Sequence, residues 1–258
     1  MSVNSKYTPD NTFFKIENET PERIALRYVE SDQYLPERYQ HNEDLQLYRY
    51  KCLRCHHDFG HAERVAKICA TLMAEISTDH DDIYAIRIAA LLHDTGYNRN
   101  KHGHAHRGAI YAHHYFQRHH LTFPRSERVI KAIWHHSVLP KDYIDHPSQE
   151  TIDPFILVLN LADKLDLTYE RVTPETDNWQ GDRQMRNIIS MTLRFNGTPD
   201  VTHPTATFNV NFYVNDKFNE PEFRDWYHFK KTQLAVQTFA KTYGYLPRIN
   251  FIYPGEVE

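Results

Sequence analysis

Histidine and aspartate residues stand on the apolar faces of four predicted helices, and this feature constrains the fold more than any other. Each lies three or four positions from an apolar residue of the buried stripe, the spacing of one helical turn. The four residues are His61, His93, His136 and Asp163. Burying such groups without a partner costs free energy. A divalent cation shared by imidazoles and carboxylates would offset that cost, so the pattern predicts helices closed around a metal.

The hydrophobic pattern predicts a mainly α-helical domain over residues 42–172, preceded by an N-terminal arm at residues 1–41. Asp153 followed by Pro154 predicts a capped helix start, and Ser126 is expected to cap another helix. The helices are expected at residues 21–30, 42–57, from 60, 81–96, 105–119, from 126 and from 154.

The pattern changes after Val172. Residues 187–195 and 207–214 alternate between apolar and polar, which predicts two strands that can pair as an antiparallel hairpin. Residues 220–243 are predicted as a helix that ends at Gly244. We therefore expect residues 173–258 to form a small C-terminal α+β extension of two strands and a helix. It could cover the pocket or form the interface of a homodimer.

Charge, cysteine content and hydropathy exclude several classes of function. The net charge of −4 argues against a general nucleic-acid-binding protein. No apolar run reaches membrane-spanning length, and the N-terminus has no cleavage signature. Three cysteines, an odd number, fit a reducing compartment better than a disulfide framework. These features predict a cytoplasmic protein with no membrane partner.

Three segments resemble the HD-domain metal-dependent phosphohydrolases. The family pattern is a histidine, a His-Asp pair and a distant aspartate. The resemblance covers residues 44–172 and implies an HD-domain helical bundle in which His61, His93, Asp94 and Asp163 bind metal, with Asp94 and His93 as the catalytic pair. The matching segments are Phe59–Val65, Ala90–Gly96 and Leu161–Leu165.

Two further segments resemble HD proteins that cleave dinucleoside polyphosphates at a two-metal site. They are His106-Arg-Gly-Ala and the stretch that ends in His136. The resemblance implies that His106 and His136 bind a second metal, with His135 as the alternative to His136. Three other histidines compete with His106, and we interpret them as surface residues: His102, His104 and His113.

The sequence departs from this family at Tyr97, where many two-metal members have a lysine that contacts phosphate. Arg99 or Lys101 could take that role, and Lys164 and Arg171 resemble family positions near the pocket. We therefore expect Lys101, Lys164 and Arg171 to bind substrate.

One or two divalent transition-metal ions are expected, with iron or manganese favoured by the resemblance. Zinc, nickel, cobalt and magnesium are alternatives. The predicted function is hydrolysis of a phosphoester, of a nucleotide or a related small molecule, by metal-activated water. The alternative is a non-catalytic metal-bound sensor or interaction module of the HD type.

Overall fold

The computed structural model describes residues 57, 59–97, 103–118, 120, 123–137, 152–172 and 180–256. The helix expected at residues 21–30 lies outside this part of the chain. The helix expected at 42–57 does so too, apart from its last residue. Lys101, Arg99 and His102 are likewise outside it.

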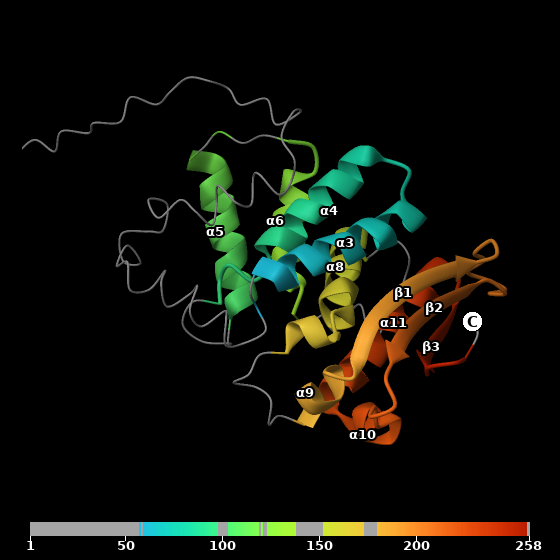
Figure 1. The fold of residues 1–258 in the computed structure, drawn as a ribbon. Coiled ribbons are helices and arrows are strands. Elements are labelled where there is room, and N and C mark those ends of the chain that lie inside the picture. The colour runs from blue at the N-terminus through green and yellow to red at the C-terminus, as the bar shows by residue number, and fades with distance from the viewer. Residues whose placement is uncertain are drawn as a thin grey trace, which may run out of the picture.

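Up to residue 172 the described chain is helical, which confirms the mainly α-helical prediction. Figure 1 shows α3, α4, α6 and α8 packed together, with α5 on the side away from the sheet. The elements are α3 (Phe59–Ile76), α4 (His80–Leu92), α5 (His104–Arg118), α6 (Ser126–His135), α8 (Pro154–Leu165) and the 3-10 helix η3 (Tyr169–Arg171).

Local capping explains where two of these helices begin. Asp153 accepts a hydrogen bond from the backbone N–H of Phe155 at 3.0 Å, as the Asp-Pro pair predicts. The prediction for Ser126 is wrong. Arg125 is the N-cap residue of α6, with a φ of 69°, and Ser126 is already helical. The chain therefore enters α6 through a left-handed residue without a side-chain cap.

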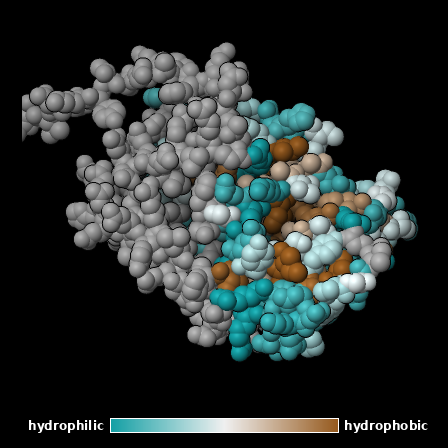
Figure 2. Space-filling view, in the orientation of Figure 1, coloured by the Kyte–Doolittle hydropathy of each residue, from teal (hydrophilic) through white to brown (hydrophobic). Residues whose placement is uncertain are grey.

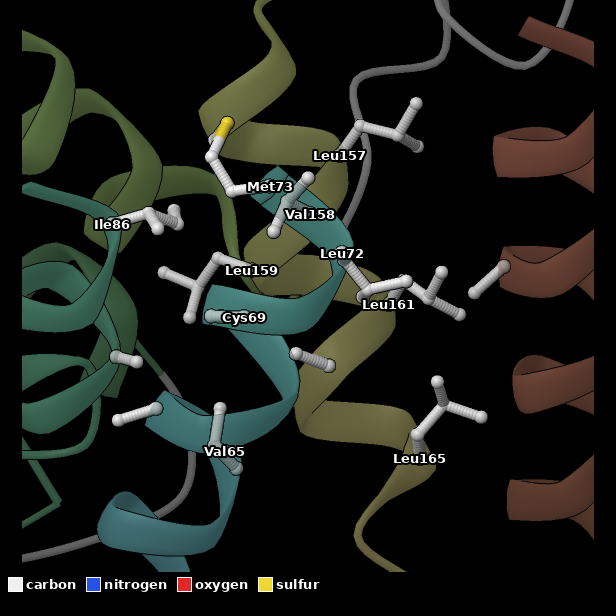
Figure 3. Packing of buried hydrophobic residues seen from close by; sticks show 14 of the residues in the cluster. Val65, Cys69, Leu72, Met73, Ile86, Leu157, Val158, Leu159, Leu161 and Leu165 are labelled. Carbon is white, nitrogen blue, oxygen red and sulfur yellow. The ribbon is translucent and has the colours of Figure 1, made fainter. Parts of the chain in front are cut away.

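Helix α8 forms the centre of the core, because it is apolar on nearly all sides. Figure 3 shows Leu157, Leu161 and Leu165 pointing toward the C-terminal helix, whereas Leu159 points the other way, toward α4. All four leucines are fully buried. Side chains on opposite faces of α8 thus pack against both parts of the molecule.

The C-terminal part is a three-stranded sheet with helices. Strands β1 (Ile188–Asn196) and β2 (Thr207–Val214) pair antiparallel, as predicted. Strand β3 (Leu246–Ile252) lies parallel to β2, and the prediction of only two strands missed it. Its polar and apolar residues alternate only from Arg248 to Phe251, and Pro247 precedes this short run.

The helix predicted at residues 220–243 is two helices, α10 (Glu220–Asp225) and α11 (Tyr227–Tyr243). Trp226 between them has an extended ψ of 130° and therefore interrupts the helix. Gly244 ends α11 with a φ of 76°, as predicted. A further short helix, α9 (Gln180–Met185), precedes the sheet.

Helix α11 joins the sheet to the helical part, since it contacts both β3 and α8. Its Phe239 ring lies 5.3 Å from that of Phe208 on the apolar face of the sheet. On the described part of the face in Figure 2, hydrophobic and hydrophilic side chains are interspersed. Among the described residues, no helix combines the length and the apolar character that crossing a membrane requires.

Candidate metal centre

Asp94 is the central residue of a buried cluster, and its two carboxylate oxygens face different neighbours. Oδ2 lies 3.1 Å from Nε2 of His93 and 3.7 Å from Nε2 of His61. Oδ1 lies 3.4 Å from Nε2 of His104 and 3.5 Å from Nε2 of His136. The carboxylate therefore stands between two pairs of imidazoles.

Asp163, from α8, completes the group on the Oδ2 side. Its Oδ1 lies 3.3 Å from Nε2 of His61 and 3.8 Å from Nε2 of His93. Two ligand atoms that each lie about 2.1 Å from a shared cation are roughly 3.0 Å apart at right angles and at most about 4.2 Å apart, so these separations fit a metal site. The structure thus brings together the four residues of the first predicted set from α3, the end of α4 and α8.

Three of the imidazoles are oriented so that Nε2 faces the cluster. Nδ1 of His93 lies 2.6 Å from the carbonyl of Ala90, and Nδ1 of His136 lies 2.8 Å from the carbonyl of Ile133. A carbonyl can only accept, so Nδ1 must carry the proton and donate it. In a neutral ring Nε2 then keeps its lone pair, which is how metal-binding histidines are commonly held.

The third imidazole, that of His61, is held by a carboxylate. Its Nδ1 lies 2.6 Å from Oδ2 of Asp166. Arg64 donates from Nε and Nη2 to the two oxygens of the same carboxylate, at 2.8 and 3.0 Å. Asp166 was not among the predicted site residues. It follows the family segment by one position, and only its contact with His61 reveals its role.

The electrostatics of the cluster favour a bound positive charge. Although burial lowers it, the pKa of His93 is raised to about 10 by the carboxylates of Asp94 and Asp163. Burial opposes ionisation of Asp94, but His93 and His57 hold its pKa well below the usual range. No contact of the buried His93 Nε2 has hydrogen-bond geometry within the described part of the chain. A cation would satisfy this atom and both carboxylates, so the residues present fit a metal.

His104 occupies the place that the sequence analysis expected for His106. The His104 ring is mostly buried and its Nε2 lies 3.0 Å from Nε2 of His136. His106 is exposed and stacks on Trp134, with ring centroids 4.1 Å apart. The two histidines are two residues apart on α5 and so face in nearly opposite directions. The expectation for His106 therefore disagrees with the structure, whereas His136 joins the cluster.

Two glycines allow α5 to bring His104 to this position. A Cβ on Gly96 would lie 2.1 Å from the carbonyl oxygen of His104 and 2.4 Å from the backbone nitrogen of Gly108. A Cβ on Gly108 would lie 3.0 Å from the carbonyl oxygen of His93. The turn after the His-Asp pair and the first turns of α5 therefore touch backbone to backbone. The choice of His104 over His106 thus depends on this close contact between the two segments.

His57 is a further histidine at the cluster that the sequence analysis did not select. Its Nδ1 lies 2.6 Å from Oδ2 of Asp94, and its ring stacks on Tyr97 at 4.3 Å between centroids. Burial lowers the pKa of His57 to about 4, although Asp94 opposes this. His57, His61 and Asp94 could also hold an ion. Tyr97, at the position of the family lysine, thus packs against the site.

A cavity of about 260 Å³ adjoins the cluster. Asp94 and Asp163 line it together with the two predicted cations Lys164 and Arg171. Nη1 of Arg171 donates to the carbonyls of Asp163 and Asp166 at 3.2 and 2.9 Å. Residues of α9 and α11 also line the cavity. The C-terminal part thus lines the pocket, which supports the first of the two roles expected for it, covering the pocket or forming a homodimer interface.

The comparisons with known proteins agree with this site. Residues 58–168 match the family model of the HD domain, a segment that contains every residue of the cluster except His57. The match supports the HD-domain superfamily and does not extend to a narrower group. A search of curated proteins found no match to the chain.

Proposed function

Because residues 58–168 match the HD domain, whose superfamily consists of metal-dependent phosphohydrolases, we propose that this protein hydrolyses a phosphoester of a nucleotide or a related small molecule. One observation carries the proposal. The two oxygens of Asp94 face separate groups of imidazoles, with His57, His61 and His93 at Oδ2 and His104 and His136 at Oδ1, as a carboxylate between two ions would. Ions in such two-metal sites lie roughly 3.5–4 Å apart.

The donor set divides between two ions. His61, His93 and Asp163 would hold one together with Oδ2 of Asp94. His104 and His136 would hold the other together with Oδ1. When bound, the ions supply Lewis acidity toward the phosphoryl oxygens and toward water. Imidazole-rich ligation favours iron or manganese, with zinc, nickel, cobalt and magnesium as alternatives.

The side chains that line the cavity would hold the substrate. Lys164 is largely buried and donates from Nζ to the carbonyls of His136 and Asn160 at 3.3 and 3.2 Å. Arg171 is held by two backbone carbonyls, so its guanidinium is already positioned. Both cations can pair with phosphate oxygens and reduce their charge during the reaction.

The proposal is tested by metal analysis of the purified full chain, followed by turnover on a panel of phosphomonoesters, phosphodiesters and nucleotides with several added metals. Asp94→Ala is expected to lose both bound metal and turnover. Asp225→Ala is the matched control, because Asp225 is exposed and pairs only with Lys230 in the described structure. Turnover that survives in Asp94→Ala at the wild-type rate would overturn the mechanism.

A wild-type chain that binds metal but cleaves no member of the panel would instead support the non-catalytic sensor. The buried cluster alone is compatible with that outcome, since it requires a cation and not a substrate. The cavity with its lysine and arginine beside the cluster favours the hydrolase.

A further inference from the structure

The cavity beside the metal cluster has a wall that the HD domain does not supply. This wall comes from α9 and the first turns of α11, which lie beyond the matched residues 58–168. Asp182 and Met185 line the cavity from α9, and Trp226 from the junction before α11. His228, Lys231 and Thr232 have the spacing i, i+3 and i+4, so one face of α11 borders the cavity.

Helix α11 is fixed against the HD domain next to this wall. Oγ1 of Thr232 donates a hydrogen bond to the carbonyl oxygen of Lys164 at 2.9 Å. Thr232 is buried, and Lys164 belongs to α8, which α11 contacts along its length (Figures 1 and 3). The position of Lys231, next to Thr232, is therefore set by the same contact that joins the two parts of the chain.

The Trp226 ring is similarly held in place. A Cβ on Gly181 would lie 2.1 Å from this ring, so α9 must have a glycine there for Trp226 to pack. The ring also packs on Phe223, with centroids 5.7 Å apart. The residue at the start of α11 is thus packed firmly into the wall of the cavity.

Lys231 has no anionic partner in the part of the chain that the structure describes. Its Nζ lies 4.5 Å from the centroid of the Tyr227 ring, and none of the ion pairs there includes it. Lys164 and Arg171 line the same cavity as Lys231. The three cations therefore repel one another at one cavity, which an anion between them would relieve.

The acidic side chains that line the cavity do not neutralise these three cations. Asp94 and Asp163 belong to the metal cluster, where cations would take up their charge, and Asp182 is the remaining acid of the lining. The first turn of α11 also has no side-chain cap at Trp226, so its backbone N–H groups add positive partial charge at the same wall. The wall therefore suits a phosphate oxygen.

We propose that Lys231 is a substrate-binding residue, which contacts a phosphate group of the substrate from the C-terminal side of the cavity. The inference rests on the proposed function for the identity of the ligand as a phosphate. It assigns to the C-terminal extension a part in substrate binding that the HD domain alone cannot provide.

The test uses the full chain loaded with manganese and measures the dissociation constant of inorganic phosphate by calorimetry. Lys231→Ala is expected to weaken phosphate binding about tenfold, as for loss of one partly exposed charge-assisted contact. Lys231→Arg, which keeps the charge, should restore most of it. Lys230→Ala is the matched control: Lys230 is on the same helix, pairs with Asp225 at 2.6 Å and does not line the cavity.

Equal phosphate affinities for Lys231→Ala and Lys230→Ala, or no phosphate binding by the wild type, would overturn the inference. On a substrate that the wild type cleaves, Lys231→Ala should raise KM with little change in kcat. If the wild type cleaves nothing but binds phosphate through Lys231, the proposed function fails and the binding site stands. If the wild type cleaves members of the panel and Lys231→Ala behaves as Lys230→Ala, the proposed function stands and the role of Lys231 in binding fails.

Discussion

The imidazole of His61 and the carboxylate of Asp166 are joined by a hydrogen bond of 2.6 Å between Nδ1 and Oδ2. Both side chains are buried, and Arg64 holds the far side of the same carboxylate. A carboxylate in this position fixes the ring and makes its other nitrogen a stronger donor to a metal. Asp166 thus acts on the cluster through His61, without facing the cavity.

Asp166→Asn is therefore expected to weaken metal binding by about 10- to 100-fold while the chain still folds. Asparagine keeps the size of the side chain but removes the charge that orients His61. The measurement is a manganese titration of the metal-free protein, with circular dichroism to check the fold. Asp225→Asn, at an exposed aspartate away from the cluster, is the control. An unchanged manganese affinity would show that Asp166 has no part in the site.

His104→Ala and His106→Ala are expected to differ, although the two residues are nearly adjacent. His104 faces Oδ1 of Asp94, whereas His106 stacks on Trp134 at the surface. Loss of His104 should reduce the bound metal from about two ions per chain to about one. His106→Ala should leave the metal content unchanged. Elemental analysis after dialysis distinguishes them, and loss of metal in His106→Ala alone would refute the structural placement.

Gly96→Ala tests the backbone contact that brings α5 to the cluster. The added Cβ would lie 2.1 Å from the carbonyl oxygen of His104, so the start of α5 must move away. Overpacking of this kind costs typically about 1–3 kcal/mol. We expect a lower thermal midpoint and a weaker second metal site, since His104 moves with the helix. A variant with wild-type stability and metal content would contradict this account of the turn.

Tyr243→Phe tests a titration far from the metal cluster. Burial raises the pKa of Tyr243 above its usual value, Asp153 adds to the rise and Arg128 opposes it. The folded state therefore keeps its proton above about pH 10, where the unfolded state loses it. Stability from this group is present below pH 10 and is lost as the pH rises further.

The corresponding measurement is the free energy of unfolding of both proteins in urea between pH 8 and 11. The difference between them should be constant up to about pH 10, and the wild type should then lose stability relative to Tyr243→Phe. Other titrating groups are common to both proteins and cancel in the comparison. A difference that stays constant through pH 11 would show that Tyr243 titrates normally.

Local pattern was sufficient to predict most helices, both antiparallel strands and the placement of His61, His93 and Asp163 at the first metal position. Capping and periodicity depend on neighbours within a few positions, so the Asp153-Pro154 start and the Gly244 end followed from the sequence. The third strand did not, because Leu246–Ile252 becomes a strand by pairing with β2, some forty positions earlier. Trp226 interrupts a pattern that the sequence presents as one helix.

Helix periodicity predicted that His61, His93 and Asp163 would face a shared interior, and the resemblance to the HD domain added Asp94. Only the tertiary structure decided between His104 and His106, since the choice depends on how closely α5 approaches the turn at Gly96. It also decided the positions of Asp166 beside His61 and Lys231 beside the cavity. Such contacts between distant segments depend on packing in three dimensions, and no local periodicity records them.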